Sequence, residues 1–252
     1  MGDKMANLHS TISFGLVNIP IIMNPIVKNN DTSFNQLHYK CGHRISYVKY
    51  CSYCKKEVKE KDIIKGYQYE KDKYVTFLKN EFEKLKPENA KEIEIVSFVP
   101  ISEVDPSYFE KSYVLDVDGK GKAYYLFCEA LKKSKLVAIA KTVIGSKFYY
   151  CILRFYNSNI IMTTLYFEEE INIPEKNLNS KVSDRELDLA MQLISSLKGK
   201  FTPQKYKDEY QDNIKKAIQN KIDGKETKNT KKKTKKQISD LMEALEKSLK
   251  EK

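Results

Sequence analysis

The sequence predicts a mainly β fold followed by helices, and two observations carry this prediction. Short runs rich in Val, Ile, Phe and Tyr recur between residues 69 and 167, separated by turn residues, at the spacing typical of a β-barrel or β-sandwich. After Pro174 the apolar residues change to helical spacing. With 252 residues, 41% of them hydrophobic, the chain is long enough to bury a core without disulfides.

The first predicted strand covers residues 11–22, "TISFGLVNIPII". Its apolar side chains alternate up to Leu16 and shift phase at Val17, directly after the stretch that contains Gly15. One extra residue in a strand moves all later side chains to the opposite face. We therefore predict a single strand with a bulge or bend at Gly15.

Further strands and two helices are predicted in the β region. The strands are expected within "YEKDKYVTFL", "EIEIVSFV", "YVLDV", "VAIAKTVI", "FYYCILRFY" and "NIIMTTLYF". The helices are expected near residues 80–85 and 122–133. The segment "DVDGKG" (116–121) has some features of a calcium loop, but its glycine comes at the fourth position and no glutamate closes the loop. We predict a hairpin turn there instead.

The region beyond the strands carries two predicted helices. Ser183 and Glu186 form a capping-box pattern in front of an apolar face that ends near Leu197. A second helix is predicted from about residue 203 to 221, because Pro203 suits the first position of a helix.

The aromatic residues of the second helix suggest an arm with one docked side. On a helix that begins near Pro203, Tyr206 and Tyr210 share one face, and lysines occupy the others. The alternative is that these tyrosines pack on the chain's own barrel.

These patterns divide the chain into four predicted parts. They are a β core at 1–177, a helical arm at 178–224, a basic flexible linker at 225–236 and a terminal amphipathic helix at 237–252. The last part has a short apolar stripe that begins at Ile238 and ends at Leu249. Since an isolated helix this short is marginal, we expect docking on a second copy or a partner to order it.

The charge of the chain points to a polyanionic partner. The formal net charge is +11, which favours nucleic acid first and an anionic membrane surface second. The segment Lys225 to Lys236, "KETKNTKKKTKK", has seven Lys and one Glu, or +6, which leaves 11 − 6 = +5 for the remainder. Binding by the body of the protein must therefore depend on where its charges are placed.

The stretch "CGHRISYVKYCSYC" (41–54) is a candidate metal site. Cys51 and Cys54 have the spacing with which two thiolates bind one Zn²⁺, and Cys41 and His43 offer two further ligands of suitable type. We predict a structural zinc ion here. The alternative is that these are thiols near a hairpin; a redox pair is less favoured, because a strand followed by a helix N-terminus is missing.

The sequence argues against an enzyme and against export. It contains no HExxH motif, no Gly-rich phosphate loop and no nucleophile motif. The acidic run at 168–170 resembles nuclease ligands, but no second acidic cluster accompanies it. Five cysteines without a disulfide pattern, no signal peptide and no apolar run of about 18 residues predict a cytoplasmic protein without a membrane span.

Several strings of the sequence, in this order, resemble the bacterial Ku family of DNA-end-binding proteins. They are "ISFGLVNIP" (12–20), "FNQLH" (34–38), "CGHRISYVKYCSYCKKEV" (41–58), "IIKGYQYEKDKYV" (63–75), "KEIEIVSFV" (91–99), "EVDPSYFEKSYVL" (103–115), "AYYLFCEAL" (123–131), "VAIAK" (137–141), "TLYFEEEI" (164–171), "FTPQKYKDEY" (201–210) and "DLMEALEKSL" (240–249). The resemblance covers nearly the whole chain. It departs from the usual pattern at "NLHST" before Ile12 and at "TVIGSKFYYCILR" after "VAIAK", which has fewer arginines.

The resemblance implies a particular architecture and function. The expected fold is a Ku-like β-barrel with a bridging arm and a C-terminal helical segment, assembled as a homodimeric ring that threads onto a double-stranded DNA end. In that family the ring serves non-homologous end joining in the bacterial nucleoid and recruits an ATP-dependent DNA ligase.

A ring held by topology needs only phosphate contacts, so sequence preference should be weak. Two copies together would carry twice +11, or +22. The candidate DNA contacts are Lys40, Arg44, Lys49, Lys141, Lys147 and Arg154; each is otherwise a solvated charge. Arg44 and Lys49 lie in the cysteine stretch, which suggests a knuckle that presents basic residues to DNA. A zinc-ribbon RNA-binding module and a metal-dependent nuclease or ligase subunit are the alternative functions.

Overall fold

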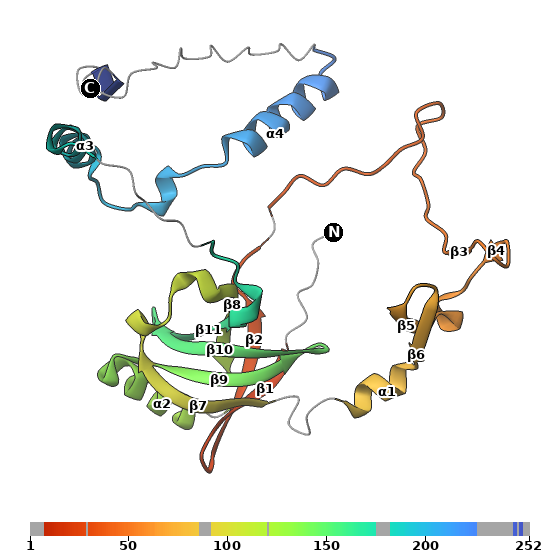
Figure 1. Ribbon diagram of the computed structural model, residues 1–252, viewed down its shortest axis with the longest axis horizontal. Coiled ribbons are helices and arrows are strands. Elements are labelled where there is room, and N and C mark those ends of the chain that lie inside the picture. Colours follow the sequence, from red (N-terminus) through yellow and green to blue (C-terminus); the bar gives the residue numbers. More distant parts are fainter. Residues whose placement is uncertain are drawn as a thin grey trace. The chain divides into compact units, whose positions relative to one another are not determined.

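The computed structural model describes residues 8–28, 30–85, 92–119, 121–174, 182–225, 244–245 and 247–248 (Figure 1). The contact pattern divides the chain into two units. The first contains the chain up to residue 29 and residues 36–173, and the second contains residues 30–35 and the chain from Pro174 onward. Each unit is described below by itself.

The first unit contains a closed seven-stranded barrel. Around the barrel the strands follow the order β1 (Leu8–Phe14), β2 (Val17–Pro25), β8 (Phe109–Val117), β11 (Asn159–Leu165), β10 (Lys147–Tyr156), β9 (Leu136–Ile144) and β7 (Glu92–Pro100). Strands β7 and β1 pair in parallel and close the barrel, and all other neighbours are antiparallel. The predicted mainly β fold is confirmed, and it is a barrel rather than a sandwich.

The barrel interior is the hydrophobic core. Ile12, Leu115, Leu153 and Met162 are fully buried in it, on strands β1, β8, β10 and β11. Because side chains alternate between the two faces of a strand, every strand contributes its inward set to one core.

Helix α2 (Lys122–Ser134) packs against β2, β9 and β10 (Figure 1). Its buried side chains are Tyr124, Phe127, Cys128 and Leu131, which follow the i, i+3, i+4, i+7 spacing of one helical face. The helix predicted near 122–133 is therefore confirmed, and it extends the barrel core.

The prediction of one continuous strand at 11–22 is wrong. Phe14 pairs with Val17, so Gly15 and Leu16 form a two-residue hairpin turn between antiparallel β1 and β2. Gly15 has a φ of +60, which glycine adopts without a steric penalty and which a type II′ turn requires at this position. A two-residue turn and a bulge both shift the side-chain phase, which explains the error.

The hairpin predicted at 116–121 is also wrong. Residues 118–121 lead from the end of β8 into α2, and Gly121 is the N-cap of that helix. A hairpin does form at Asn157 and Ser158, between β10 and β11. Both residues have positive φ, as a type I′ turn requires.

Residues 36–85 form an insertion between β2 and β7. It contains two separate hairpins, β3 (Tyr50–Cys51) with β4 (Lys56–Glu57) and β5 (Lys65–Glu70) with β6 (Lys73–Phe77), and helix α1 (Lys79–Lys84). A short 3₁₀ turn, η1 (Glu60–Asp62), lies between the hairpins. None of the described side chains of the insertion is buried. The insertion therefore has no hydrophobic core of its own.

Further 3₁₀ turns lie at Ile101–Glu103 (η2), Pro106–Tyr108 (η3) and Glu168–Glu170 (η4). They follow β7, precede β8 and follow β11 respectively, so they close the ends of barrel strands.

The second unit contains helices α3 (Asp184–Leu197) and α4 (Glu209–Ile222), with a 3₁₀ turn at Pro203–Lys205 (η5) between them. The predicted capping box is confirmed: the Glu186 N–H donates to Ser183 Oγ, and the Glu186 carboxylate accepts from the Ser183 N–H at 2.8 Å. Thr32 N–H donates to Gln211 Oε1 at 3.1 Å, which ties residues 30–35 to α4.

The predicted start of the second helix near Pro203 is wrong. Asp208 caps α4, because its side chain accepts from the Gln211 N–H at 2.9 Å. Tyr206 therefore lies outside α4 and stacks on Phe201, with ring centroids 5.4 Å apart. Tyr206 and Tyr210 do not share a helix face.

The predicted linker at 225–236, apart from Lys225, lies outside the described residues. Of the predicted terminal helix, the structure describes Ala244, Leu245, Lys247 and Ser248, all helical. The Ser248 hydroxyl donates to the Ala244 carbonyl oxygen at 2.7 Å, four residues earlier.

Candidate nucleic-acid interface

The first group of predicted DNA contacts lies at the start of the insertion. Lys40, Arg44 and Lys49 are all exposed. Lys40 lies in the turn between His38 and Cys41, and Arg44 pairs with Leu37 in an isolated bridge directly after that turn. Lys49 forms an ion pair with Glu60. The backbone of one short hairpin therefore carries both Lys40 and Arg44.

The second group lies on the barrel, where two lysines are paired with carboxylates. Lys141 on β9 lies 3.0 Å from Glu94 on the neighbouring strand β7. Lys147 at the start of β10 lies 3.4 Å from Glu170, and this carboxylate raises the pKa of Lys147. A paired lysine must give up its carboxylate to bind phosphate, so these two are weaker candidates than an unpaired cation.

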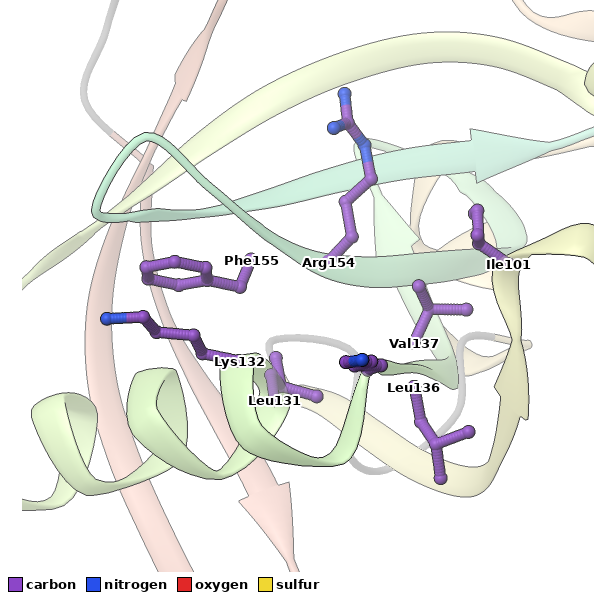
Figure 2. A pocket seen from close by; sticks show the side chains of 8 residues that line it. Ile101, Leu131, Lys132, Leu136, Val137, Arg154 and Phe155 are labelled. Carbon is purple, nitrogen blue, oxygen red and sulfur yellow. The ribbon is translucent and has the colours of Figure 1, made fainter.

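Arg154 near the end of β10 lines an open pocket of about 290 Å³ on the barrel (Figure 2). Lys132 and Lys135, at the end of α2, line the same pocket together with apolar side chains that include Phe155. Figure 2 shows the Arg154 side chain extending away from Lys132 and Phe155. Among the described residues no carboxylate lies within ion-pair distance of Arg154. The Arg154 guanidinium lies over the Tyr156 ring, with its Cζ 5.1 Å from the ring centroid.

The pocket adds two cations that the sequence analysis missed. Lys132 lies in the last turn of α2, and Lys135 is the C-cap of that helix. Arg154 lies two residues before the end of β10, and all three side chains line the same pocket. The only signal in the sequence is the "KKSK" ending of a predicted helix, and lysines are common at helix ends because they interact with the last carbonyls.

The predicted zinc ligands form pairs rather than one cluster. The Cys54 N–H donates to Cys51 Sγ at 3.4 Å. Cys41 Sγ lies 3.0 Å from Nδ1 of His38, a residue that the sequence analysis did not select. His43 Nδ1 lies 2.8 Å from the backbone carbonyl oxygen of Cys41. Among the described residues no three His, Cys, Asp or Glu side chains form a group suited to a metal ion.

The thiols differ in their electrostatic environments. Hydrogen bonds from Cys54, first from its backbone N–H, lower the pKa of Cys51, and the contact with Cys51 raises the pKa of Cys54. Cys128 and Cys151 are buried in the barrel core, and burial raises the pKa of Cys151 to about 12. The two barrel thiols are therefore inert core residues.

The acidic run Glu168–Glu170 has a structural role. Glu170 accepts from the Phe167 N–H at 2.9 Å, which lowers the pKa of Glu170, and it pairs with Lys147. These contacts hold the 3₁₀ turn that follows β11 against the start of β10.

Large apolar side chains are exposed in both units outside the barrel. On α3, Leu187, Met191, Ile194 and Leu197 lie along one side and are each at least half exposed, with Ile194 at 61%. In the insertion the exposed apolar residues include Leu37, Tyr39, Tyr47, Tyr53 and Tyr67. Neither α3, α4 nor the insertion has a buried residue among those that the structure describes. Exposed apolar surfaces of this kind are typical of regions that contact another protein.

None of the helices in the described part of the chain is long and apolar enough to span a bilayer.

The chain is similar to one protein family over most of its length. A family model described as "Ku70/Ku80 beta-barrel domain" matches residues 13–189. The chain is 38% identical to the non-homologous end joining protein Ku of Desulfitobacterium hafniense over 242 residues, which cover 95% of this chain and 85% of that protein. It is 39% identical to the protein of the same name from Lachnoclostridium phytofermentans over 248 residues, covering 98% and 96% of the two chains.

A third relative, from Heliobacterium modesticaldum, carries the same name. It is 39% identical over 203 residues, which are 79% of this chain and 74% of that protein. The matched region contains all seven barrel strands except the first residues of β1, together with the whole insertion.

Proposed function

The chain belongs to the bacterial Ku family of non-homologous end joining proteins, and we propose that it binds double-stranded DNA ends as a ring-shaped homodimer in this repair pathway. The observation that carries the proposal is the similarity to the family over nearly the whole chain. The closed barrel of the structure agrees with the β-barrel domain that the family model describes. Within this role the protein binds DNA and holds it, and catalysis belongs to a partner.

Binding without base readout agrees with the kinds of cation that the chain presents. The exposed candidates Lys40 and Arg44 lie at the turn of one short hairpin. Lysine and arginine side chains on such loops contact phosphates, which have the same geometry in every sequence. The resulting affinity depends strongly on salt and little on sequence.

A homodimer is supported by the apolar surface outside the barrel. The insertion and helices α3 and α4 display many apolar side chains, but the described residues of these parts bury none of them. Burial of such side chains contributes about 25 cal/mol per Å² of apolar area, so a second copy that covers them stabilises both chains. Because the same surfaces occur on each copy, a two-fold assembly covers both at once.

Recruitment of an ATP-dependent DNA ligase is the second part of the proposal. It rests on the family and on the apolar stripe between Ile238 and Leu249, which follows a lysine-rich segment. A short amphipathic helix on a polar tether is a common form of partner-binding element. Its effective concentration near the DNA end is set by the length of the tether.

A competition between linear and covalently closed circular duplex of the same sequence tests the proposal. We expect the linear form to compete far better at equal nucleotide concentration, and sedimentation at micromolar concentration to give a dimer. Equal competition by circles would contradict end binding. Preference for structured RNA would support the alternative of an RNA-binding module, and cleavage or sealing of the linear DNA in Mg²⁺ would support the nuclease or ligase alternative.

A further inference from the structure

The first of two turns in the insertion brings an imidazole and a thiol together. His38 and Cys41 are separated by two residues, and His38 Nδ1 lies 3.0 Å from Cys41 Sγ. The Gly42 N–H donates to the His38 carbonyl oxygen and the His38 N–H donates to the His43 carbonyl oxygen, both at 2.8 Å. These bonds close a tight hairpin turn. Gly42 has a φ of +70, a conformation that favours glycine.

The second turn joins β3 to β4 and contains two thiols. Cys51 and Cys54 are also separated by two residues, and the Cys54 N–H donates to Cys51 Sγ at 3.4 Å. Cys51 pairs with Lys56 across the hairpin. Lys55, directly after Cys54, has a φ of +49. A lysine in this left-handed conformation is uncommon and costs free energy.

The two turns therefore have the same arrangement of side chains and backbone. Each supplies two nitrogen or sulfur side chains at positions i and i+3, and in each the next residue turns the chain away in the left-handed region. Together they provide one imidazole and three thiols. Four ligands of this kind are the complete set of a closed tetrahedral zinc site.

We propose that these two turns bind one structural Zn²⁺ through His38, Cys41, Cys51 and Cys54. In this structure the two pairs remain separate, and no group of three such ligands occurs among the described residues. The ion would be the group that joins them. Residues 42–50 connect the pairs, and a chain of this length reaches about 30 Å when extended, so it can fold back to place both turns on one ion.

The structure favours His38 over His43 as the nitrogen ligand. The His38 ring is the one that touches the Cys41 thiol. His43 Nδ1 is instead directed at the backbone carbonyl oxygen of Cys41. His43 therefore suits a supporting role beside the site, where a hydrogen bond holds the first turn in shape.

The insertion has a physical need for such a cross-link. None of its described side chains is buried, so hydrophobic packing within the insertion cannot fix the two turns relative to one another. Small elements without a core commonly use a structural metal for this purpose. Lys40 lies between two of the ligands, so the ion would also fix the backbone of a candidate phosphate contact.

Elemental analysis of the full-length protein, purified from zinc-containing medium without chelators, tests the proposal. We expect about one zinc per chain. Cys51→Ser and His38→Asn each remove a ligand and should lose the metal. His43→Asn changes only a supporting residue and is the matched comparison; it should weaken metal binding by no more than about 10- to 100-fold. In cobalt-loaded protein, the thiolate-to-metal absorption should correspond to three thiolates and should fall in Cys41→Ser.

The same samples distinguish the other outcomes. A near-normal melting transition of the barrel core in Cys51→Ser would show that metal loss is not caused by unfolding, since Cys51 lies outside the barrel. Metal-free protein with three reactive thiols in these turns would overturn the proposal, as would a Cys51–Cys54 disulfide found by mass. Loss of zinc from His43→Asn but not from His38→Asn would overturn the ligand set.

Discussion

The Tyr124 hydroxyl of α2 donates a 2.6 Å hydrogen bond to the backbone carbonyl oxygen of Leu115 on β8. The Tyr124 hydroxyl oxygen in turn accepts a 3.3 Å hydrogen bond from the N–H of Ile160, which faces Leu115 across the β8–β11 pair. One side chain thus stands between two strands of the barrel ladder and attaches α2 to both. Burial raises the pKa of Tyr124 to about 12.

Replacing this hydroxyl should destabilise the barrel. Tyr124→Phe leaves two buried backbone groups without a partner, and we expect the free energy of unfolding to fall by about 1–3 kcal/mol. Urea titration followed by circular dichroism measures this. Because the folded pKa lies above the ordinary value near 10, the contribution of Tyr124 is complete below pH 10 and declines toward pH 12. The difference between the two proteins should therefore shrink over that range; a difference that grows would contradict the assignment.

Lys40 of the insertion should contribute more to DNA affinity than the paired lysines of the barrel. Each phosphate contact contributes about 0.9 to the slope of log affinity against log salt. Lys40→Gln should make this slope shallower, whereas Lys141→Gln should change it little, because Lys141 is paired with Glu94. Glu94→Gln is the control, since it frees Lys141 without adding a cation. A large loss in Lys141→Gln, with a gain in Glu94→Gln, would place the DNA on that face of the barrel instead.

Deleting Lys225 to Lys236 should weaken binding without changing its preference for ends. The deletion removes a net charge of +6 from each chain. Filter binding over a range of salt concentrations should give a shallower slope, because fewer counterions are released. Replacing the lysines by glutamines at constant length separates charge from tether length. If the deletion removed end preference but left total affinity unchanged, the ring would not be the element that recognises ends.

Shortening the chain should separate DNA binding from ligase recruitment. A protein ending at Gly224 keeps α4 and the hydrogen bond between Thr32 and Gln211. It should dimerise and bind ends, but it should no longer stimulate the ligase in a joining assay. A protein ending at Gly199 lacks α4 and should lose stability. Full ligase stimulation by the chain ending at Gly224 would show that the recruiting element lies elsewhere.

Local signals predicted much of the barrel. The strand runs from residue 92 to 167 and the helix near 122–133 are present in the structure, because side-chain alternation and helical spacing are set by neighbouring residues. A turn and a bulge at Gly15 produce the same phase shift, so the sequence pattern does not distinguish them. Pro203 suits a helix start, but the side chain of Asp208 provides the actual cap, so α4 begins later than the sequence predicts.

The candidate site was less predictable, because its contacts connect distant parts of the sequence. No local pattern indicates that Lys141 pairs with Glu94 or that Lys132 and Arg154 line the same pocket, since strand order around the barrel decides both. The contact between His38 and Cys41 is local, and its two-residue spacing matches that of Cys51 and Cys54. That match is the signal that would have selected His38.

The most direct test of the central claim is whether the protein is trapped on DNA whose ends are closed after loading. The protein is loaded onto linear duplex, both ends are then blocked with streptavidin on terminal biotins, and the salt concentration is raised until phosphate contacts are lost. A threaded dimer should stay on the blocked DNA, leave it after restriction cleavage of the duplex, and fail to load when the blocks are added first. Release from blocked DNA at the same salt as from open DNA would contradict a ring that encloses the duplex.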